Sequence, residues 1–282
     1  MRFVFYNHYH NGDIFASKAY VEDIIKEFPK NEFYYQHFNS SKLLRDVNIE
    51  FKSLETPMGE ISDRLPFLVT NNTIFINTWI GNYLNLGDGI NWVTYHKMFE
   101  KIYSVIENET DKKIDIGPVD YYIPEIRYEY FDIPNLDIPR NSVLISNGPV
   151  MSGQSNISSI DFIVRWILEN TDRTIILTHF ADFRDERIAY TNNIINTSGG
   201  DLNEISWVAT NCSHIIGRNS GPFCFTHTNK MLNDPNKTFI SIGNKESDAF
   251  PFGVNIKSNY NFINDSSEEE VLRMLGENLY NL

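Results

Sequence analysis

Three residues near the N-terminus have the side chains and the position for general acid–base chemistry. Asp13 comes after the expected first strand, and His8 and His10 lie in the same turn. Ligands of open α/β sheets bind beyond the carboxyl ends of the strands, where a carboxylate can take a proton from an attacking hydroxyl group. Asp13 is therefore a candidate base, and His8 and His10 are candidates for the same role or for contact with a phosphate.

Each of these residues also has a simpler interpretation. Asp13 could cap the following helix, and the histidines could bond only to the backbone. A His-x-His pair also suggests metal binding, but no third or fourth ligand stands nearby in the sequence. We therefore expect no metal site here.

A small-residue turn in the second half of the chain has the character of a phosphate site. An apolar strand at 214–217 is followed by Asn219, Ser220 and Gly221, and Pro222 suits the first turn of a new helix. Backbone N–H groups and the helix dipole favour an anion at such a turn. We expect the diphosphate of a nucleotide-sugar there, with Arg218 as a neutralising cation unless it is an ordinary surface arginine.

Other polar residues follow the remaining strands expected in the second half. The loop after the strand at 142–146 is rich in glycine and in hydrogen-bond donors, which suits contact with phosphate oxygens. The alternative for each of these segments is an ordinary solvent-exposed loop. The candidate donor-binding residues are Asn147, Gly148, Ser152, Gly153 and Gln154 in that loop, His179 and Asp182 after the strand at 174–178, and Lys245 and Glu246 after the strand at 239–243.

Three aromatic residues of the first half are candidates for binding the acceptor. Trp79, Tyr83 and Trp92 flank a polar, glycine-rich segment that follows a strand. Aromatic faces commonly line sugar sites, and core packing is an equally good interpretation.

Two motifs resemble those of a known family. The stretch GRNSGPFCF, preceded by DLNEISWVATNCSHII, resembles the donor-site signature of heptosyltransferase-like glycosyltransferases, the ADP-heptose lipopolysaccharide heptosyltransferase type. Gly12-Asp13-Ile14 is similar to the G-D-[VIL] motif of the same family. Two positions depart from the pattern, because the usual aspartate is Asn219 and the usual histidine is Cys224.

The resemblance implies a two-domain GT-B fold and transfer of a sugar from a nucleotide-diphosphate-sugar to a glycan or glycolipid acceptor. It implies that Asp13 is the base, that the turn at 219–222 and the loop at 147–154 bind the donor, and that no metal is needed. The nucleotide-sugar is then a co-substrate, and no further cofactor is expected.

The composition sets outer limits on function. A net charge of −13 and a pI near 5.0 argue against a nucleic-acid partner. The two cysteines, Cys212 and Cys224, fit free thiols in a reducing compartment. No run is long enough for a transmembrane segment and no signal peptide is apparent, so the sequence predicts a cytoplasmic protein.

The pattern of elements predicts an α/β protein with two Rossmann-like domains facing a cleft. We expect an acceptor-side domain at 1–138 and a donor-binding domain at 139–282, with the last helix packing on either one. No GxGxxG fingerprint for a dinucleotide is present. The expected strands are 2–8, 32–38, 47–51, 67–70, 73–76, 142–146, 174–178, 214–217 and 239–243. The expected helices are 14–28, 92–107, 159–170, 201–212 and 266–280, with a further one that starts at Pro222 and includes His227.

The favoured function is an inverting, metal-independent glycosyltransferase. A nucleotide-sugar 2-epimerase would share the architecture without needing an acceptor site. A non-catalytic nucleotide-sugar-binding or scaffold protein is a third possibility, which the changes at Asn219 and Cys224 keep open.

Overall fold

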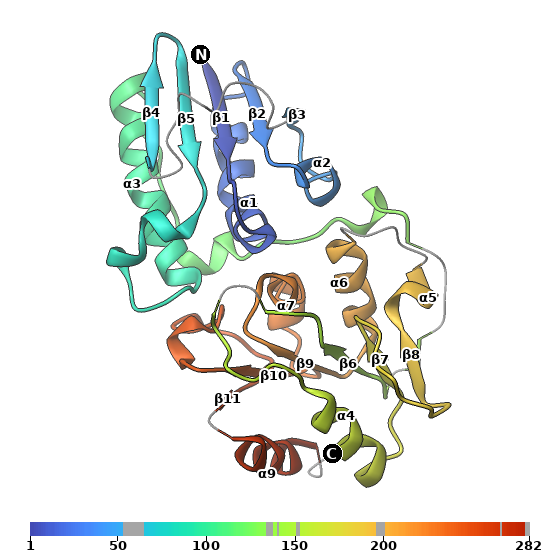
Figure 1. Ribbon diagram of the computed structural model, residues 1–282. Coiled ribbons are helices and arrows are strands. Elements are labelled where there is room, and N and C mark those ends of the chain that lie inside the picture. The colour runs from blue at the N-terminus through green and yellow to red at the C-terminus, as the bar shows by residue number, and fades with distance from the viewer. Residues whose placement is uncertain are drawn as a thin grey trace. The chain divides into compact units, whose positions relative to one another are not determined.

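The computed structural model describes residues 1–52, 65–133, 138–139, 141–150, 153–195, 201–265 and 267–279 (Figure 1). Contacts between residues divide the chain into two units. The first comprises Met1–Tyr130 and Pro251–Asn255, and the second comprises Phe131–Phe250 and Ile256–Leu282. Each unit has its own sheet and its own core, as expected for a chain of this length.

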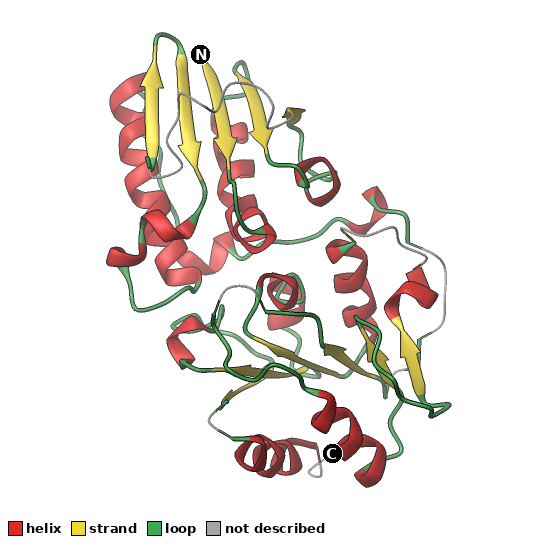
Figure 2. Ribbon diagram, viewed as in Figure 1, coloured by secondary structure: helices red, strands yellow, loops and turns green. Residues whose placement is uncertain are grey.

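The first unit contains a five-stranded sheet in the order β3-β2-β1-β5-β4 (Figure 2). Strands β1, β2, β3 and β5 are parallel, and β4 pairs antiparallel with β5. The β4–β5 turn places Asn71 at a φ of 48°, a left-handed conformation that asparagine tolerates in tight hairpins. The strands are β1 Arg2–Tyr6, β2 Glu32–Gln36, β3 Glu50–Lys52, β4 Phe67–Thr70 and β5 Thr73–Asn77.

Two long helices of the first unit pack against each other through aromatic rings. The ring of Tyr20 stacks on Phe99 at 4.1 Å and on Tyr122 at 4.2 Å between centroids. Such pairs add to the stabilisation that comes from buried area. The helices are α1 Asn11–Glu27, α2 Ser40–Leu43 and α3 Trp92–Thr110, with 3₁₀ turns η2 Ile80–Asn82, η3 Leu84–Leu86, η4 Val119–Tyr122 and η5 Tyr128–Tyr130.

The second unit is built on a six-stranded parallel sheet in the order β11-β10-β9-β6-β7-β8. The chain starts in the centre at β6, adds β7 and β8 on one side, then returns to add β9, β10 and β11 on the other. This is the doubly wound order, in which a ligand binds where the direction reverses, here between β6 and β9. The strands are β6 Val143–Ser146, β7 Ile175–Leu177, β8 Ile188–Tyr190, β9 His214–Arg218, β10 Thr238–Gly243 and β11 Asn259–Asn264.

Helices cover both faces of this second sheet (Figure 1). On one face, Ile216 and Ile240 meet apolar residues of α4 and α9 in a single core cluster. The neighbouring residues Ile215 and Phe239 point to the opposite face, because side chains alternate along a strand. The helices are α4 Asp161–Asn170, α5 Thr191–Ile195, α6 Leu202–Asn211, α7 Gly221–Cys224, α8 Asn229–Leu232 and α9 Glu268–Leu279, with the 3₁₀ turn η6 Glu246–Asp248.

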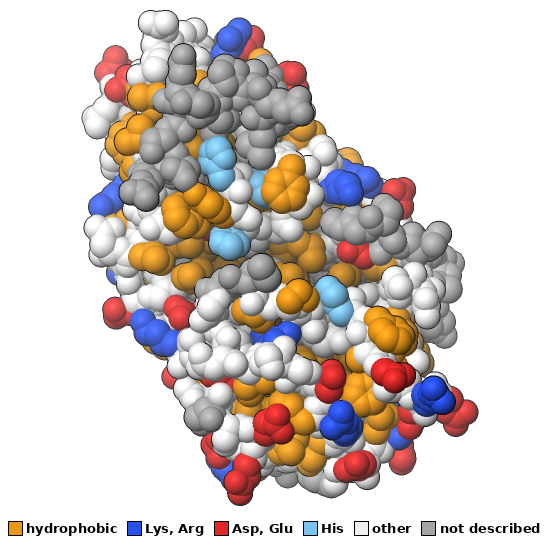
Figure 3. Space-filling model, in the orientation of Figure 1, with side chains coloured by type: hydrophobic (Ala, Val, Ile, Leu, Met, Phe, Trp, Pro, Cys, Tyr) orange, Lys and Arg blue, Asp and Glu red, His pale blue; other side chains and the backbone are white. Residues whose placement is uncertain are grey.

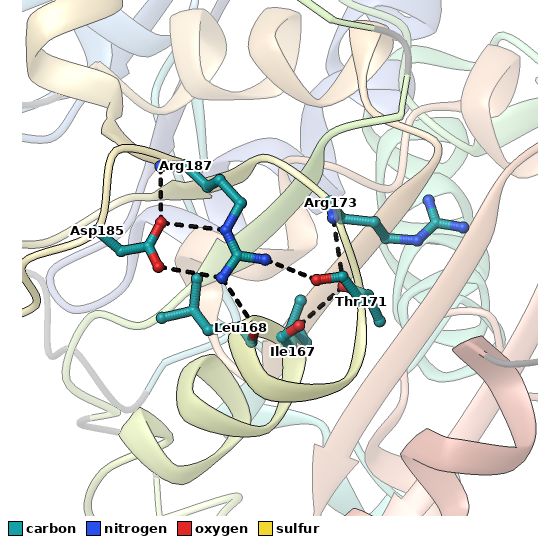
Figure 4. A network of polar contacts seen from close by, with 6 residues as sticks. All are labelled: Ile167, Leu168, Thr171, Arg173, Asp185 and Arg187. Atoms are coloured by element: carbon teal, nitrogen blue, oxygen red, sulfur yellow. Dashed lines mark hydrogen bonds and ion pairs between the residues drawn. The ribbon is translucent and has the colours of Figure 1, made fainter.

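Arginine and lysine side chains hold the carboxyl ends of two of these helices. Arg187 pairs with both oxygens of Asp185 and donates to the carbonyl oxygens of Leu168 and Thr171, where α4 ends (Figure 4). Lys237 donates to the carbonyl oxygens of Ala209, Thr210 and Cys212 at the end of α6. A cation at this place satisfies carbonyls that the helix leaves free and complements its dipole.

Most predicted elements are confirmed within two or three residues, including the hairpin of β4 and β5. Strands β8 and β11 were not predicted. The helix expected from Pro222 is wrong in extent, because α7 ends at Cys224 and α8 begins only at Asn229. The last helix packs in the core of the second unit through Val271 and Leu275, so the alternative of packing on the first unit is not what the structure shows.

Candidate functional site

The turn after β1 is organised by one buried side chain that the sequence did not single out, Asn7. Its Oδ1 accepts hydrogen bonds from the backbone N–H groups of Tyr9 and His10 at 2.8 and 3.3 Å. Its Nδ2 donates to the carbonyl oxygen of His10 at 3.1 Å. Asparagine is favoured in turns because it makes such bonds, and here they set the direction in which α1 starts.

Asp13 does not cap α1, so that alternative is wrong. The N-cap residue is His10, and Asp13 is the third residue of the helix, 3% exposed. Its Oδ1 accepts hydrogen bonds from the Ile80 N–H at 2.8 Å and from the Tyr95 hydroxyl at 2.7 Å. Asp13 therefore joins α1, η2 and α3.

Burial raises the pKa of the Asp13 carboxyl group, and this effect outweighs the opposing hydrogen bonds from Ile80 and Tyr95 and the charge of His10. Within the described part of the chain, both side-chain contacts of the carboxylate go to Oδ1. The backbone N–H of Asp13 itself also acts on the carboxylate. A carboxylate whose pKa is closer to neutrality is better matched to work as a general base.

His8 and His10 lie at the same end of the sheet, where they influence a third histidine that the sequence did not indicate, His37. Burial lowers the pKa of His37 to about 4, and the charges of His8 and His10 add to the effect. Figure 3 shows histidine surface near the carboxyl ends of the first unit's strands. The sequence feature that could have indicated His37 is its position just after the second strand, which matches the position of His8 after the first.

The three aromatic candidates of the first unit differ in their surroundings. Trp79 is partly exposed and lies 4.4 Å from the ring of Tyr9, which is 43% exposed. Trp92 is buried beside Phe15 and Tyr95. Tyr83 is also buried, and its hydroxyl donates to the carbonyl of Pro66. Tyr83 and Trp92 are therefore core residues, which corrects their assignment to acceptor binding, and Tyr9 joins Trp79 as the accessible aromatic pair.

In the second unit, Asn147 ties the end of β6 to the end of β7. Its Oδ1 accepts from the His179 N–H at 2.8 Å, and its Nδ2 donates to the His179 carbonyl at 2.9 Å. Gly148 lies under the imidazole of His179, because a β-carbon at this glycine would come within 2.4 Å of the ring. The charges of Asp201 and Arg218 also act on His179. The structure thus brings Asn147, Gly148, His179 and Arg218 together.

Arg218 occupies the switch point between β6 and β9 and is only 3% exposed. Its guanidinium group donates to the carbonyl oxygens of Ile157 and Ser158 at 2.8 Å each, and to those of Asn147 and Gly148. These four carbonyls lie at the two ends of the loop after β6. Arg218 therefore closes that loop, a role that differs from the surface arginine considered above.

The charge of Arg218 is buried without an ion-pair partner among the described residues. Burial lowers its pKa, and Asp161 opposes this effect from a distance. Nε of Arg218 has no hydrogen-bond partner in the described part of the chain. A cation held in this way at the switch point provides a local positive potential in a chain of net charge −13.

Asn219 and Ser220 continue from β9 into α7. The side chain of Asn219 accepts from the Ser241 hydroxyl, and its Nδ2 is buried with no partner among the described residues. A β-carbon at Gly243 would lie 2.8 Å from that Nδ2, so glycine is needed for the close approach. Ser220 caps α7 by accepting from the Phe223 N–H at 3.5 Å, with Pro222 in the first turn.

α7 is too short to provide a strong helix dipole for binding a phosphate. Only Gly221–Cys224 are helical, so the dipole is that of one turn. Cys224 is fully buried, and His227 lies beyond α7, stacked on Phe239 at 5.0 Å between ring centroids. Burial lowers the pKa of His227 to about 4, which makes it a neutral core residue.

The remaining donor candidates have varied surroundings. The Gln154 and Gly153 carbonyls accept from Asn244 at 3.1 and 3.0 Å, which joins the β6 loop to the end of β10. Ser152 lies outside the described residues. Asp182, Lys245 and Glu246 are exposed. Asp265, which the sequence did not indicate, accepts from the Ser155 hydroxyl and the Asn156 backbone and anchors the far side of this loop.

We expect the Arg218→Met variant to lose about 2–4 kcal/mol of unfolding free energy, because four carbonyls of the loop after β6 lose a charged donor whose side chain is buried. For the nucleotide that the sequence predicts at this turn, the affinity should weaken about tenfold or more as the loop opens and the cation is removed. Isothermal titration and chemical denaturation measure the two effects. The control is Arg165→Met, an exposed arginine of α4; equal behaviour of the two variants would contradict the assigned role.

No metal site or membrane-spanning helix occurs among the described residues. No group of three or more His, Cys, Asp and Glu side chains could hold a metal ion in that part of the chain. No described helix has both the length and the apolar character to cross a bilayer.

No protein-family model matches the chain, and no curated protein matches it significantly in sequence. Solved structures do match over nearly the whole chain. E. coli heptosyltransferase WaaC with ADP-2-deoxy-2-fluoro heptose shares 11% identity over 99% of this chain and 100% of that chain, with a TM-score of 0.53. E. coli ADP-heptose LPS heptosyltransferase II shares 13% identity over 100% and 99% of the two chains, with a TM-score of 0.50.

A further structure of WaaC, with ADP, gives 10% identity, coverage of 99% and 98%, and a TM-score of 0.50. At these identities the likeness establishes the fold. The chain has the α/β, GT-B-type fold of the heptosyltransferases, which confirms the fold class and the structural resemblance predicted from the two motifs.

Proposed function

We propose that this protein is a glycosyltransferase that moves a sugar from a nucleotide-diphosphate-sugar to an acceptor hydroxyl group. The observation that carries the proposal is the state of Asp13. This carboxylate lies at the carboxyl end of β1, in the motif shared with the heptosyltransferase family. It is buried with a raised pKa, and its Oδ1 accepts hydrogen bonds from the Ile80 N–H and the Tyr95 hydroxyl.

The chemistry that we assign to the chain is direct displacement with inversion. Asp13 takes the proton of the acceptor hydroxyl, whose oxygen attacks the anomeric carbon as the bond to the diphosphate breaks. Negative charge then develops on the departing nucleoside diphosphate. The second unit supplies stabilising groups at the β6–β9 switch point, with the cation of Arg218 and the polar groups of Asn219 and Ser220.

We further propose that the transfer needs no divalent metal, because the buried charge of Arg218 can counter part of the diphosphate charge. The structural neighbours include heptosyltransferase structures with ADP and with an ADP-sugar analogue, so ADP-sugars come first in any panel. The acceptor that we propose is a glycan or glycolipid.

The experiment is a thermal-shift panel of nucleoside diphosphates and nucleotide-sugars, with and without EDTA, followed by product analysis. A ligand at about 100 times its dissociation constant stabilises the folded protein by roughly 2.7 kcal/mol, a shift that is readily measured. We expect one nucleoside family to shift the melting temperature equally with EDTA, and its sugar to be transferred or slowly hydrolysed.

Other results would identify the alternatives. Interconversion of the free nucleotide-sugar would indicate a 2-epimerase, and binding without turnover would indicate a scaffold. If no member of the panel shifts the melting temperature, the donor site at Asn219–Gly221 is wrong.

A further inference from the structure

His37 is a buried histidine whose Nε2 has no hydrogen-bond partner among the described residues. It lies just beyond β2 and is 3% exposed. Its Nδ1 accepts a hydrogen bond from the backbone N–H of Asn39 at 3.0 Å. The neutral ring therefore carries its proton on Nε2, which is buried.

A buried donor without an acceptor is costly, and it is often explained by a bound group. Nε2 of His8 is likewise buried without a partner in the described part of the chain. Tyr6 and Gln36 pair at the ends of β1 and β2, which places the residues that follow them side by side, and the charges of His8 and His10 act on His37. The three imidazoles thus form a histidine cluster (His8, His10 and His37) at the carboxyl ends of β1 and β2.

The same cluster lies at the start of a long helix. The Nδ2 of Asn39 donates to Oδ1 of Asn11 at 3.1 Å, which holds the segment after β2 against the first residue of α1. α1 has 17 residues, and its N-cap, His10, makes no side-chain hydrogen bond to the first turn. The positive end of this helix dipole therefore lies at His10 and beside the segment that follows His37, an arrangement that favours an anion.

We propose that the histidine cluster and the start of α1 form a binding site for an oxyanion, a phosphate or a carboxylate group. Nε2–H of His37 and the ring nitrogens of His8 and His10 would donate to its oxygens. Asp13 acts on the cluster through His10, and its Oδ1 accepts from Ile80 and Tyr95. As part of the proposed function, this site assigns an anionic group to the substrates that meet at Asp13.

Two substitutions of His37 distinguish loss of the Nε2–H donor from loss of the local loop structure. In His37→Asn, the side-chain oxygen can still accept from the Asn39 N–H, so the loop is kept and the Nε2 donor is lost. In His37→Gln, the amide nitrogen can reach the position of Nε2, so the donor is kept. We expect phosphate affinity to fall about tenfold in His37→Asn, equivalent to ~1.4 kcal/mol, and to recover in part in His37→Gln.

The experiment titrates the full-length protein with inorganic phosphate and with acetate, and follows the imidazole ¹⁵N and ¹H resonances of histidine by NMR. A shift of the His37 Nε2 resonance identifies the site directly and separates it from phosphate bound in the second unit. Repeating the titration with saturating nucleoside diphosphate distinguishes the sources. If the nucleoside diphosphate competes with phosphate at His37, the site binds the diphosphate of the donor. If phosphate binding at His37 is unchanged, the site binds an anionic group of the acceptor.

The proposal is overturned if the His37 resonances do not respond to either anion, or if His37→Asn binds phosphate as tightly as the natural chain. Nucleoside diphosphate binding and sugar transfer are measured on the same samples. If these persist while His37 does not respond, the oxyanion site is wrong and the proposed function stands. If the natural chain neither binds a nucleoside diphosphate nor transfers sugar, the proposed function is contradicted instead.

Discussion

Replacing Asp13 by asparagine is expected to reduce sugar transfer by about 10²–10⁴-fold while leaving nucleotide binding unchanged. The amide oxygen can accept the same two hydrogen bonds, from the Ile80 N–H and the Tyr95 hydroxyl, so the geometry is kept. The amide cannot take a proton from the acceptor. Initial rates with the donor identified by the panel, together with titration of the nucleoside diphosphate, measure the two quantities.

The same variant should be more stable than the natural chain at neutral pH. The folded-state pKa of Asp13 is raised, so the unfolded chain releases this proton at lower pH than the folded chain. Between the two pKa values the folded state binds more protons, and stability falls as pH rises, by up to ~1.4 kcal/mol per pH unit. Asp13→Asn removes this loss, so its advantage should grow from about pH 4 upward and level off above the folded pKa.

Asp115→Asn is the matched control, because Asp115 is an exposed carboxylate of the same unit. It should change neither the transfer rate nor the pH dependence of unfolding. Transfer at a near-natural rate in Asp13→Asn would remove Asp13 as the base. A variant that is inactive and also less stable at all pH values would instead indicate that the carboxylate serves to hold Ile80 and Tyr95.

The second large effect is expected from Lys18→Met, which should lower the unfolding free energy of the first unit by about 3–5 kcal/mol. Lys18 forms an ion pair with Asp46 in which both side chains are almost fully buried. Lys18 also donates to the Glu125 carbonyl, and Asp46 accepts from the Arg127 N–H at 3.0 Å. Removing the lysine leaves the carboxylate charge of Asp46 buried without its cation.

Hydrogen exchange of the α1 amides, measured in the full chain, reports this loss separately from the second unit. Lys26→Met, an exposed position on the same helix, should have little effect. The double variant Lys18→Met/Asp46→Asn should recover part of the stability, since the amide is uncharged and can still accept from Arg127. A loss below about 1 kcal/mol in Lys18→Met would show that the pair contributes no more than an exposed ion pair.

The Lys18–Asp46 pair also explains why the segment after α3 belongs to the first unit. This proline-rich stretch has no clear periodicity, and the sequence suggested only a crossover between domains. In the structure its residues Ile123 and Ile126 are buried, and Glu125 and Arg127 bond to the ion pair. Nothing local in the sequence signals this, because the partners lie 81 to 107 residues away.

Local patterns were sufficient where an element depends on its own residues. Buried parallel strands such as β6 and β10 are continuous apolar runs, and the amphipathic helices α3 and α4 show the 3.6-residue period, so both kinds were predictable. β11 was missed because asparagines alternate with its apolar residues, and the strand forms by pairing along β10. α7 was predicted too long. The residues Ser220, Gly221 and Pro222 signal the start of a helix in the sequence, but no residue near Cys224 signals its end.

For the site, the sequence by itself determined which turns follow parallel strands, and therefore where Asp13, Asn147, Arg218 and Asn219 could meet a ligand. It also determined the two motifs that indicated the fold. The tertiary structure alone decided the state of each side chain: the hydrogen bonds of Asp13, the enclosure of Arg218 by four carbonyls, the burial of Trp92 and the burial of His37 Nε2 without a partner among the described residues. The physical reason is that burial and long-range hydrogen bonds set the charge and the availability of a group, and both depend on residues far apart in the chain.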